Sequence, residues 1–221
     1  MKQKFFWILL PAALWIVLFC LRPVVFHPWC AVQPSPCVVG AVNAFDRIVF
    51  HFHSRFADFM SNLVQNTAGV ILFLLPILIL KNWKRIADLE MILVMGTFWD
   101  GAMIELTRAI AQRPRPLVMN NPMGDGANIN QYTSFYSGHT SFVAFAGIST
   151  YLWMRLHYSK DDRRVQIAAL LTVAIVTLTA VLRVMGGRHF PTDTMAGAIA
   201  GGMVALVVWT RATRTYSLES I

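Results

Sequence analysis

Charged residues are scarce in this chain of 221 residues. Asp, Glu, Lys and Arg together make up 14% of it, whereas a soluble domain typically contains about 25%. Hydrophobic residues make up 56%, and the mean hydropathy is +0.54. This balance argues against an ordinary soluble domain and predicts a membrane-embedded protein with a single domain over residues 1–221.

The usual motifs of nucleic-acid and metal binding are also missing. We find no basic-aromatic ladder, no zinc knuckle and no Gly-rich phosphate loop. The net charge of +8 comes mainly from short basic segments between apolar runs, which suit anionic lipid headgroups better than a nucleic-acid groove. We therefore expect the lipid bilayer as a partner, and no nucleic acid, metal or cofactor. The oligomeric state stays open.

Cysteine is rare, with three residues in the whole chain. Cys20 lies inside the first apolar run, where packing is its simplest role. Cys30 and Cys37 flank a Pro-rich loop and lack the paired partners that a metal site needs. If this loop faces an oxidising compartment, we expect a disulfide between them.

A signal-peptidase cleavage site is absent after the first apolar run. Lys2 and Lys4 precede apolar residues 5–20 and resemble the start of a signal peptide. The run is long, however, and continues into Leu21-Arg22-Pro23 without a small-x-small motif. We therefore expect a retained first transmembrane helix.

Six apolar segments have about the ~20 residues that cross the hydrocarbon core of a bilayer. They are residues 5–22, 56–80, 89–111, 138–156, 166–186 and 191–210. Helices are expected because lipid offers no partner for backbone N–H and C=O groups. The third segment is the least apolar, since it carries Asp100 and Glu105. The predicted fold is all-α, a polytopic integral membrane protein with six transmembrane helices.

Basic residues predict the orientation of these helices. With six spans, four basic segments fall on one side, and the positive-inside rule makes that side the cytoplasm. Their residues are Lys2, Lys4, Lys81, Lys84, Arg85, Arg155, Lys160, Arg163, Arg164, Arg211 and Arg214. Both termini are then cytoplasmic.

Two segments on the opposite side have their own patterns. Apolar residues from Phe45 to Phe56 recur at helical spacing, with Asp46, Arg47, His51 and Ser54 between them. This pattern predicts an amphipathic helix in the outer interface, or an extension of the second helix. The polar segment 117–135 has no obvious structure of its own, and is either a binding loop or a passive connector.

Three polar clusters stand out on that same outer side. They are Arg108-x6-Arg115-Pro116, Ser137-Gly138-His139 and Arg183-x5-His189-x3-Asp193. Arginine recognises phosphate through planar, bidentate hydrogen bonds, and ionisable groups near hydrocarbon usually have a function. Because the clusters lie at the ends of the last four predicted helices, we predict that they form one phosphate-cleaving site.

The two histidines have complementary predicted roles. Asp193 follows His189 by four residues and is expected to fix its tautomer, which leaves the other ring nitrogen free to attack. Ser137 is expected to cap a helix in whose first turn His139 lies, placed to protonate a leaving oxygen. Gly138 allows a ligand to approach the backbone. The alternatives are a structural His-Asp pair and a simple helix cap.

Arg108, Arg115 and Arg183 are expected to form the phosphate clamp. Glu105 lies three residues before Arg108 on one helix face and is expected to hold it.

Other residues near these clusters have simpler interpretations. Arg113 and Arg188 are expected mainly to meet headgroups, with contact to substrate as the alternative. Asp100 is expected to be the buried partner of another polar group. Gly197 and Gly201 predict close packing of the last helix.

The three clusters resemble the signature of the type 2 phosphatidic acid phosphatase superfamily. That signature is Lys-x6-Arg-Pro, then Pro-Ser-Gly-His, then Ser-Arg-x5-His-x3-Asp, and the match runs from Arg108 to Asp193. Arg108 stands where lysine is usual, Tyr136 where proline is usual and Leu182 where serine is usual. The arginine keeps the charge but changes its reach and geometry.

The resemblance implies an activity and a role for each matched residue. His189 attacks phosphorus and becomes phosphorylated, Asp193 orients it, and His139 protonates the leaving group before water releases phosphate. No metal takes part. The phosphoryl oxygens are bound by Arg108, Arg115, Ser137, Gly138 and Arg183.

The resemblance also implies a substrate class and a location. Bacterial members act on lipid phosphates such as undecaprenyl diphosphate, phosphatidylglycerol phosphate and lipid A. We therefore expect a phosphatase of the bacterial cytoplasmic (inner) membrane with its site on the periplasmic face. The alternatives are a lipid phosphotransferase with the same site, and a non-catalytic membrane scaffold or transporter.

Overall fold

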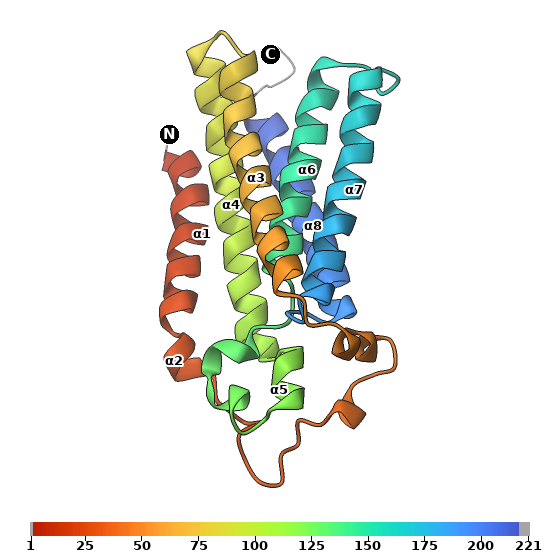
Figure 1. Ribbon diagram of the computed structural model, residues 1–221. Coiled ribbons are helices and arrows are strands. Elements are labelled where there is room, and N and C mark those ends of the chain that lie inside the picture. Colours follow the sequence, from red (N-terminus) through yellow and green to blue (C-terminus); the bar gives the residue numbers. More distant parts are fainter. Residues whose placement is uncertain (1, 217–221) are drawn as a thin grey trace.

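The computed structural model describes residues 2–216, and in that range it contains helices and no strands (Figure 1). Six long helices form a bundle: α1 (Lys2–Cys20), α3 (Arg55–Ile79), α4 (Trp83–Ala111), α6 (Gly138–His157), α7 (Arg163–Met185) and α8 (Pro191–Tyr216). Each coincides with one of the six predicted segments, so the all-α prediction is confirmed.

The bounds of the helices differ from the prediction where caps decide them. Asn82 caps α4, accepting hydrogen bonds from the backbone N–H of Lys84 at 2.9 Å and of Arg85 at 3.4 Å. The helix therefore begins before the predicted start at residue 89. The first helix ends at Cys20, and a short helix α2 (Arg22–Val25) with Pro23 in its first turn follows.

Three helices among the described residues are long and apolar enough to cross a membrane. They are Arg55–Ile79, Arg163–Met185 and Pro191–Thr213. Large apolar side chains also point outward from the bundle, and Leu78, Ile110 and Leu170 are each more than 70% exposed. Such an outer surface suits contact with lipid. The structure thus supports a membrane protein. Of the other long helices, α1 has a shorter apolar segment, Phe6–Cys20, and α4 carries the buried Asp100 and Glu105.

The two ends of the bundle differ. The N-terminal end of α1 and the C-terminal end of α8 lie together at one end (Figure 1). The short elements α2 and α5 (Pro116–Asn120) lie at the opposite end, where α4 and α7 finish and α3, α6 and α8 begin. This second end carries the three polar clusters, as predicted.

Close packing of α6 against α8 depends on glycine. A Cβ atom on Gly197 would lie 2.5 Å from the carbonyl oxygen of Ser137, and one on Gly201 would collide with the carbonyl oxygen of Ser141. The prediction of a small-residue packing face is confirmed. Because Ser137 caps α6, this contact also sets the position of α8 relative to the second cluster.

The segment between α2 and α3 differs from the amphipathic helix that was predicted. It contains two short 3₁₀ helices, η1 (Val39–Ala41) and η2 (Asp46–His51), and α3 begins only at Arg55, after the N-cap Ser54. Asp46, expected on the polar face, is completely buried. An extension of the second helix is also wrong, since Phe52 has extended backbone.

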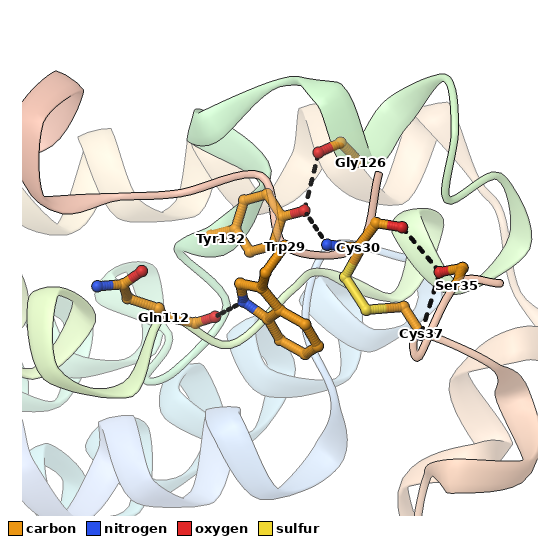
Figure 2. Close-up of a disulfide and its surroundings, with 7 residues drawn as sticks. All are labelled: Trp29, Cys30, Ser35, Cys37, Gln112, Gly126 and Tyr132. Carbon is orange, nitrogen blue, oxygen red and sulfur yellow. Dashed lines mark hydrogen bonds between the residues drawn. A yellow bond between two sulfur atoms is a disulfide. The ribbon is translucent and has the colours of Figure 1, made fainter. Parts of the chain in front are cut away.

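A disulfide joins Cys30 to Cys37 at the same end of the bundle, with a Cα–Cα distance of 5.3 Å (Figure 2). This confirms the predicted bond. The hydroxyl of Tyr132 accepts from the Cys30 N–H at 2.9 Å and donates to the Gly126 carbonyl at 2.8 Å. The Trp29 indole donates to the Gln112 carbonyl at 3.4 Å. The disulfide loop is therefore tied to the end of α4 and to the following loop.

Segment 117–135 has more structure than the sequence indicated. It contains most of α5 and the 3₁₀ helices η3 (Asp125–Ala127) and η4 (Ile129–Tyr132). Val118 and Tyr132 are fully buried against the disulfide. Packing on another segment, and not local periodicity, orders this loop.

Candidate active site

The structure brings the three clusters together. His189 is nearly fully buried between α7 and α8, and the charges of Arg183, Arg115 and Arg108 all act on it. Gly138 lies against Arg108, since a Cβ atom there would be 3.1 Å from the Nη2 of that arginine. The Ser137 N–H donates to the Asp193 carbonyl at 3.0 Å. Residues of all three clusters therefore lie together in one place, as the sequence predicts.

One ring nitrogen of His189 is held by the backbone. Its Nδ1 lies 2.7 Å from the carbonyl oxygen of Ser134. A carbonyl only accepts, so this contact assigns the proton to Nδ1 and leaves Nε2 unprotonated. Burial, together with Arg183 and Arg115, lowers the pKa of His189 well below its ordinary value of 6.5. A neutral imidazole with a free Nε2 has the form that a nucleophile requires.

Asp193 acts on His189 through Ser134. The carboxylate lies 3.8 Å from the His189 Nδ1, which is too long for a hydrogen bond. Its Oδ2 instead accepts from the Ser134 hydroxyl at 2.6 Å and from the Phe190 N–H at 3.0 Å. The direct hydrogen bond expected from the spacing is absent, and Asp193 fixes the residue whose carbonyl holds the histidine.

Arg113 binds two carboxylates, those of Asp193 and Asp46. Its Nη1 donates to Asp193 Oδ1 at 2.5 Å and its Nη2 to Asp46 Oδ2 at 2.7 Å. Asp46 also accepts from the N–H and hydroxyl of Thr192, at 2.9 and 2.7 Å. Burial alone would raise the pKa of Asp46, but these hydrogen bonds outweigh it and lower that pKa. The sequence did not indicate these two carboxylate partners of Arg113.

Helix α3 supplies the partner of Arg183. Asp58 accepts from the Arg183 Nη1 at 2.8 Å and, with its other oxygen, from the Arg188 Nη2 at 2.7 Å. Ser61 accepts from the same Arg183 nitrogen at 3.1 Å. Arg188 was expected mainly to meet headgroups. It is 38% exposed and is held by Asp58 beside the site.

Glu105 holds Arg108, as predicted. Its Oε1 accepts from the Arg108 Nη1 at 2.9 Å. The same carboxylate also binds Arg22 of α2 through both oxygens, at 2.7 and 2.5 Å. Gly138 leaves room for Arg108 next to the start of α6, which agrees with the predicted close approach there.

The three clamp arginines keep donors unused. Arg115 donates to the Thr133 hydroxyl at 3.1 Å, and burial together with Arg108 and Arg183 lowers its pKa to about 9. The Nε atoms of Arg108, Arg115 and Arg183 are all buried and have no hydrogen-bond partner among the described residues. Unpaired buried donors are costly, so this arrangement is suited to an anion with several oxygens.

His139 lies in the first turn of α6, as predicted. Ser137 is the N-cap and accepts from the Thr140 N–H at 3.5 Å. The His139 Nε2 lies 2.6 Å from Asn62 Oδ1 on α3. With the amide oxygen as acceptor, this contact assigns a proton to Nε2. When Nδ1 is protonated as well, the cationic ring can donate that second proton to a leaving oxygen.

Two further observations complete the description of the polar groups. Asp100 is buried and accepts from the Ser141 hydroxyl at 2.5 Å, which confirms that it is the partner of a polar group. Within the described residues, no group of three or more His, Cys, Asp or Glu side chains is placed to hold a metal ion.

The model of the PAP2 superfamily matches residues 89–216, which contain all three clusters. The chain belongs to the PAP2 superfamily. It is 29% identical over 132 residues to the probable lipid phosphate phosphatase beta of Arabidopsis thaliana. That alignment covers 51% of this chain and 61% of the relative, so the chain spans less than two thirds of the relative's length. No solved structure matches the chain.

This PAP2 protein also uses residues that precede the matched region. Each of them contacts a residue of the clusters or its immediate partner: Arg22 on Glu105, Asp46 on Arg113, Asp58 on Arg183 and Asn62 on His139. Sequence reasoning missed all four. In the sequence, each is a polar residue within or next to an apolar segment. That pattern does not indicate which residue of the site it contacts.

Proposed function

We propose that this protein is a membrane lipid phosphatase that works through a phosphohistidine intermediate. The observation that carries the proposal is the buried His189, whose Nδ1 is held by the Ser134 carbonyl, in a site with three arginines whose Nε donors are unused. This combination offers a nucleophile together with a binding site for phosphoryl oxygens. Membership of the PAP2 superfamily and similarity to a probable lipid phosphate phosphatase support it.

In the proposed reaction, the His189 Nε2 attacks phosphorus and the bond from phosphorus to the lipid oxygen breaks. His139 acts as an imidazolium: its Nε2–H stays on Asn62 and its Nδ1 proton goes to that leaving oxygen. Water then attacks the phosphohistidine and releases inorganic phosphate, with His139 taking the proton back. Arg108, Arg115 and Arg183 stabilise the charge spread over the phosphoryl oxygens.

The start of α6 adds a second kind of phosphate contact to this proposal. Ser137 and Gly138 begin the helix, and the N–H groups of a helix N-terminus attract anions. Gly138 keeps the backbone accessible beside Arg108. Asp193 has a positioning role in this scheme, since it fixes Ser134 and thereby the tautomer of His189.

An apolar cavity supports a lipid as the substrate. It has a volume of about 320 Å³ and lies between α1, α4 and α8, where Trp99, Met103 and Met203 are among its lining residues. Tyr136 also lines it and directly precedes Ser137, so the cavity begins beside the phosphate site. A hydrocarbon tail suits such a cavity. Undecaprenyl diphosphate, phosphatidylglycerol phosphate and lipid A are the candidate substrates.

We further propose a single domain with six spans and both termini in the cytoplasm. The site then faces the periplasm of a bacterial cytoplasmic membrane. Lys81, Lys84 and Lys160 lie at the end of the bundle opposite the site, in keeping with the positive-inside rule. The Cys30–Cys37 disulfide lies at the site end, which suits an oxidising compartment.

The test is phosphate release by the purified protein from a panel of these lipid phosphates, with a chelator present. We expect release from at least one lipid, no loss of rate with chelator, and no release by His189→Ala. Transfer of phosphate to a second lipid in place of free phosphate would instead indicate a phosphotransferase. Absence of both products, or a rate that requires an added divalent ion, would contradict the proposal.

A further inference from the structure

Arg22 connects a region outside the PAP2 match to the phosphate clamp. It starts the short helix α2 and binds Glu105 in a bidentate pair, with Nε to Oε2 at 2.7 Å and Nη2 to Oε1 at 2.5 Å. The Arg22 side chain is 16% exposed and the Glu105 side chain 4%. A paired charge in such a setting is weakly screened by solvent.

Glu105 therefore lies between two cations. Its Oε1 accepts from both Arg22 and Arg108. With Arg22 present, the three side chains carry a net charge of +1. Without Arg22, the carboxylate of Glu105 would cancel the charge of Arg108 and would compete with phosphate for its donors.

We infer that Arg22 is a positioning residue for phosphate binding, acting on Arg108 through Glu105. It neutralises Glu105, so that the charge of Arg108 stays available to the phosphoryl group. It also fixes the carboxylate that orients the Arg108 guanidinium, whose buried Nε has no partner among the described residues. This inference rests on the proposed function of the clamp as a phosphate site.

The position of α2 does not depend on Arg22 alone. The Gln112 side chain donates to the Val25 carbonyl at 3.0 Å, and Trp29 donates to the Gln112 carbonyl (Figure 2). The disulfide loop is held separately through Tyr132. Loss of the Arg22 side chain should therefore leave α2 against the end of α4.

The experiment measures binding of inorganic phosphate and of vanadate to the purified protein by calorimetry, together with hydrolysis of the best lipid. Arg22→Ala should weaken phosphate binding on the order of tenfold, the usual scale for a charged hydrogen bond. Arg22→Lys should retain most of the affinity, since it keeps the charge. Arg47→Ala is the matched control, because Arg47 lies at the same end and, among the described residues, its side chain donates to the carbonyls of Val42 and Gly40 and to no acid.

The decisive variant is the double substitution Arg22→Ala with Glu105→Gln. It removes the Glu105 carboxylate together with Arg22, its partner. Phosphate affinity should therefore return most of the way to the wild-type value. A purely structural role for Arg22 would give no such recovery. In an Arg108→Ala background, Arg22→Ala should have little further effect, because the residue through which it acts is gone.

Two results would overturn the inference: phosphate binding by Arg22→Ala equal to wild type, or a loss that the double variant does not recover. If Arg22→Ala fails to fold, Arg22→Gln in the same pairings gives the same comparison. Phosphate binding is measured without turnover. The role of Arg22 in binding and the proposed phosphatase activity can therefore be refuted independently of each other. A wild-type protein that binds phosphate but cleaves no lipid phosphate would count against the proposed function alone.

Discussion

At the scale of single residues, the site is a set of three buried arginines, two of which form an ion pair with an acid. Glu105 forms an ion pair with Arg108, and Asp58 forms one with Arg183. Arg115 instead donates a hydrogen bond to a neutral threonine, Thr133. Each arginine keeps a buried Nε without a partner among the described residues. The acids hold the guanidinium groups in place, and the unused donors keep the site suited to an oxyanion.

Arg108 tests whether the guanidinium shape matters at the position where the family signature has lysine. Arg108 already donates one nitrogen to Glu105 and has a second nitrogen close to Gly138. Lysine is a point charge and cannot do both. Arg108→Lys should lower kcat/KM. The loss should correspond to about 1–3 kcal/mol of transition-state stabilisation, and Arg108→Ala should cost more. Steady-state kinetics on the best lipid decides this. An equal or faster rate with lysine would show that only the positive charge counts.

Arg115 should influence the pH dependence of the reaction. Its charge is among the causes that lower the pKa of His189, so Arg115→Gln should raise that pKa. On acidification, His189 of the variant would then become protonated, and so inactive as a nucleophile, at a higher pH than in the wild type. The acid limb of the kcat/KM profile should shift upward relative to wild type on the same substrate. A lower rate with an unmoved acid limb would argue against His189 as the titrating group.

The sequence could predict which polar residues gather at one end of the bundle, but not the contacts that hold them. Spacing placed His189, His139 and the three arginines at one end of the bundle. It could not predict that Ser134 binds the His189 ring, because that bond uses a backbone carbonyl. The partners Asp46 and Asp58 are far from Arg113 and Arg183 in the chain, and their contacts depend on how the helices are rotated.

At the scale of elements, long helices were predictable and short ones were not. The six long helices follow from apolar length and from caps such as Ser137. The 3₁₀ helices η2 and η4 are too short to have a periodic pattern. Tertiary contacts order them, with Asp46 bound to Arg113 in one case and Tyr132 packed on the disulfide in the other.

The disulfide should stabilise the elements that it touches. Cys30→Ser with Cys37→Ser removes a cross-link that closes a short loop, which costs roughly 2–3 kcal/mol in chain-entropy terms. Thermal unfolding in detergent should show a lower Tm for this variant. Cys20→Ser is the control, since Cys20 is an exposed free thiol. An unchanged Tm would mean that Tyr132 and Trp29 alone hold the loop.

At the scale of the whole molecule, the candidate site lies at one end of the bundle, and the lysine-containing loops between α3 and α4 and between α6 and α7 lie at the other. In the proposed topology, Ala127 lies outside the cell membrane and Lys160 lies in the cytoplasm. Both positions are exposed in loops at opposite ends of the bundle. In a Cys20→Ser background, Ala127→Cys should react with a membrane-impermeant thiol reagent in intact cells. Lys160→Cys should react only after permeabilisation, and the reverse result would invert the topology.

The central claim is that His189 carries the phosphoryl group between lipid and water. The most direct measurement uses a lipid phosphate with a radiolabelled phosphate group, mixed briefly with purified protein and quenched in base. We predict a protein-bound label that is stable in base and labile in acid, that maps to His189 by peptide analysis, and that is absent from His189→Ala. Labelling of His189→Ala, or hydrolysis by that variant at the wild-type rate, would contradict the account.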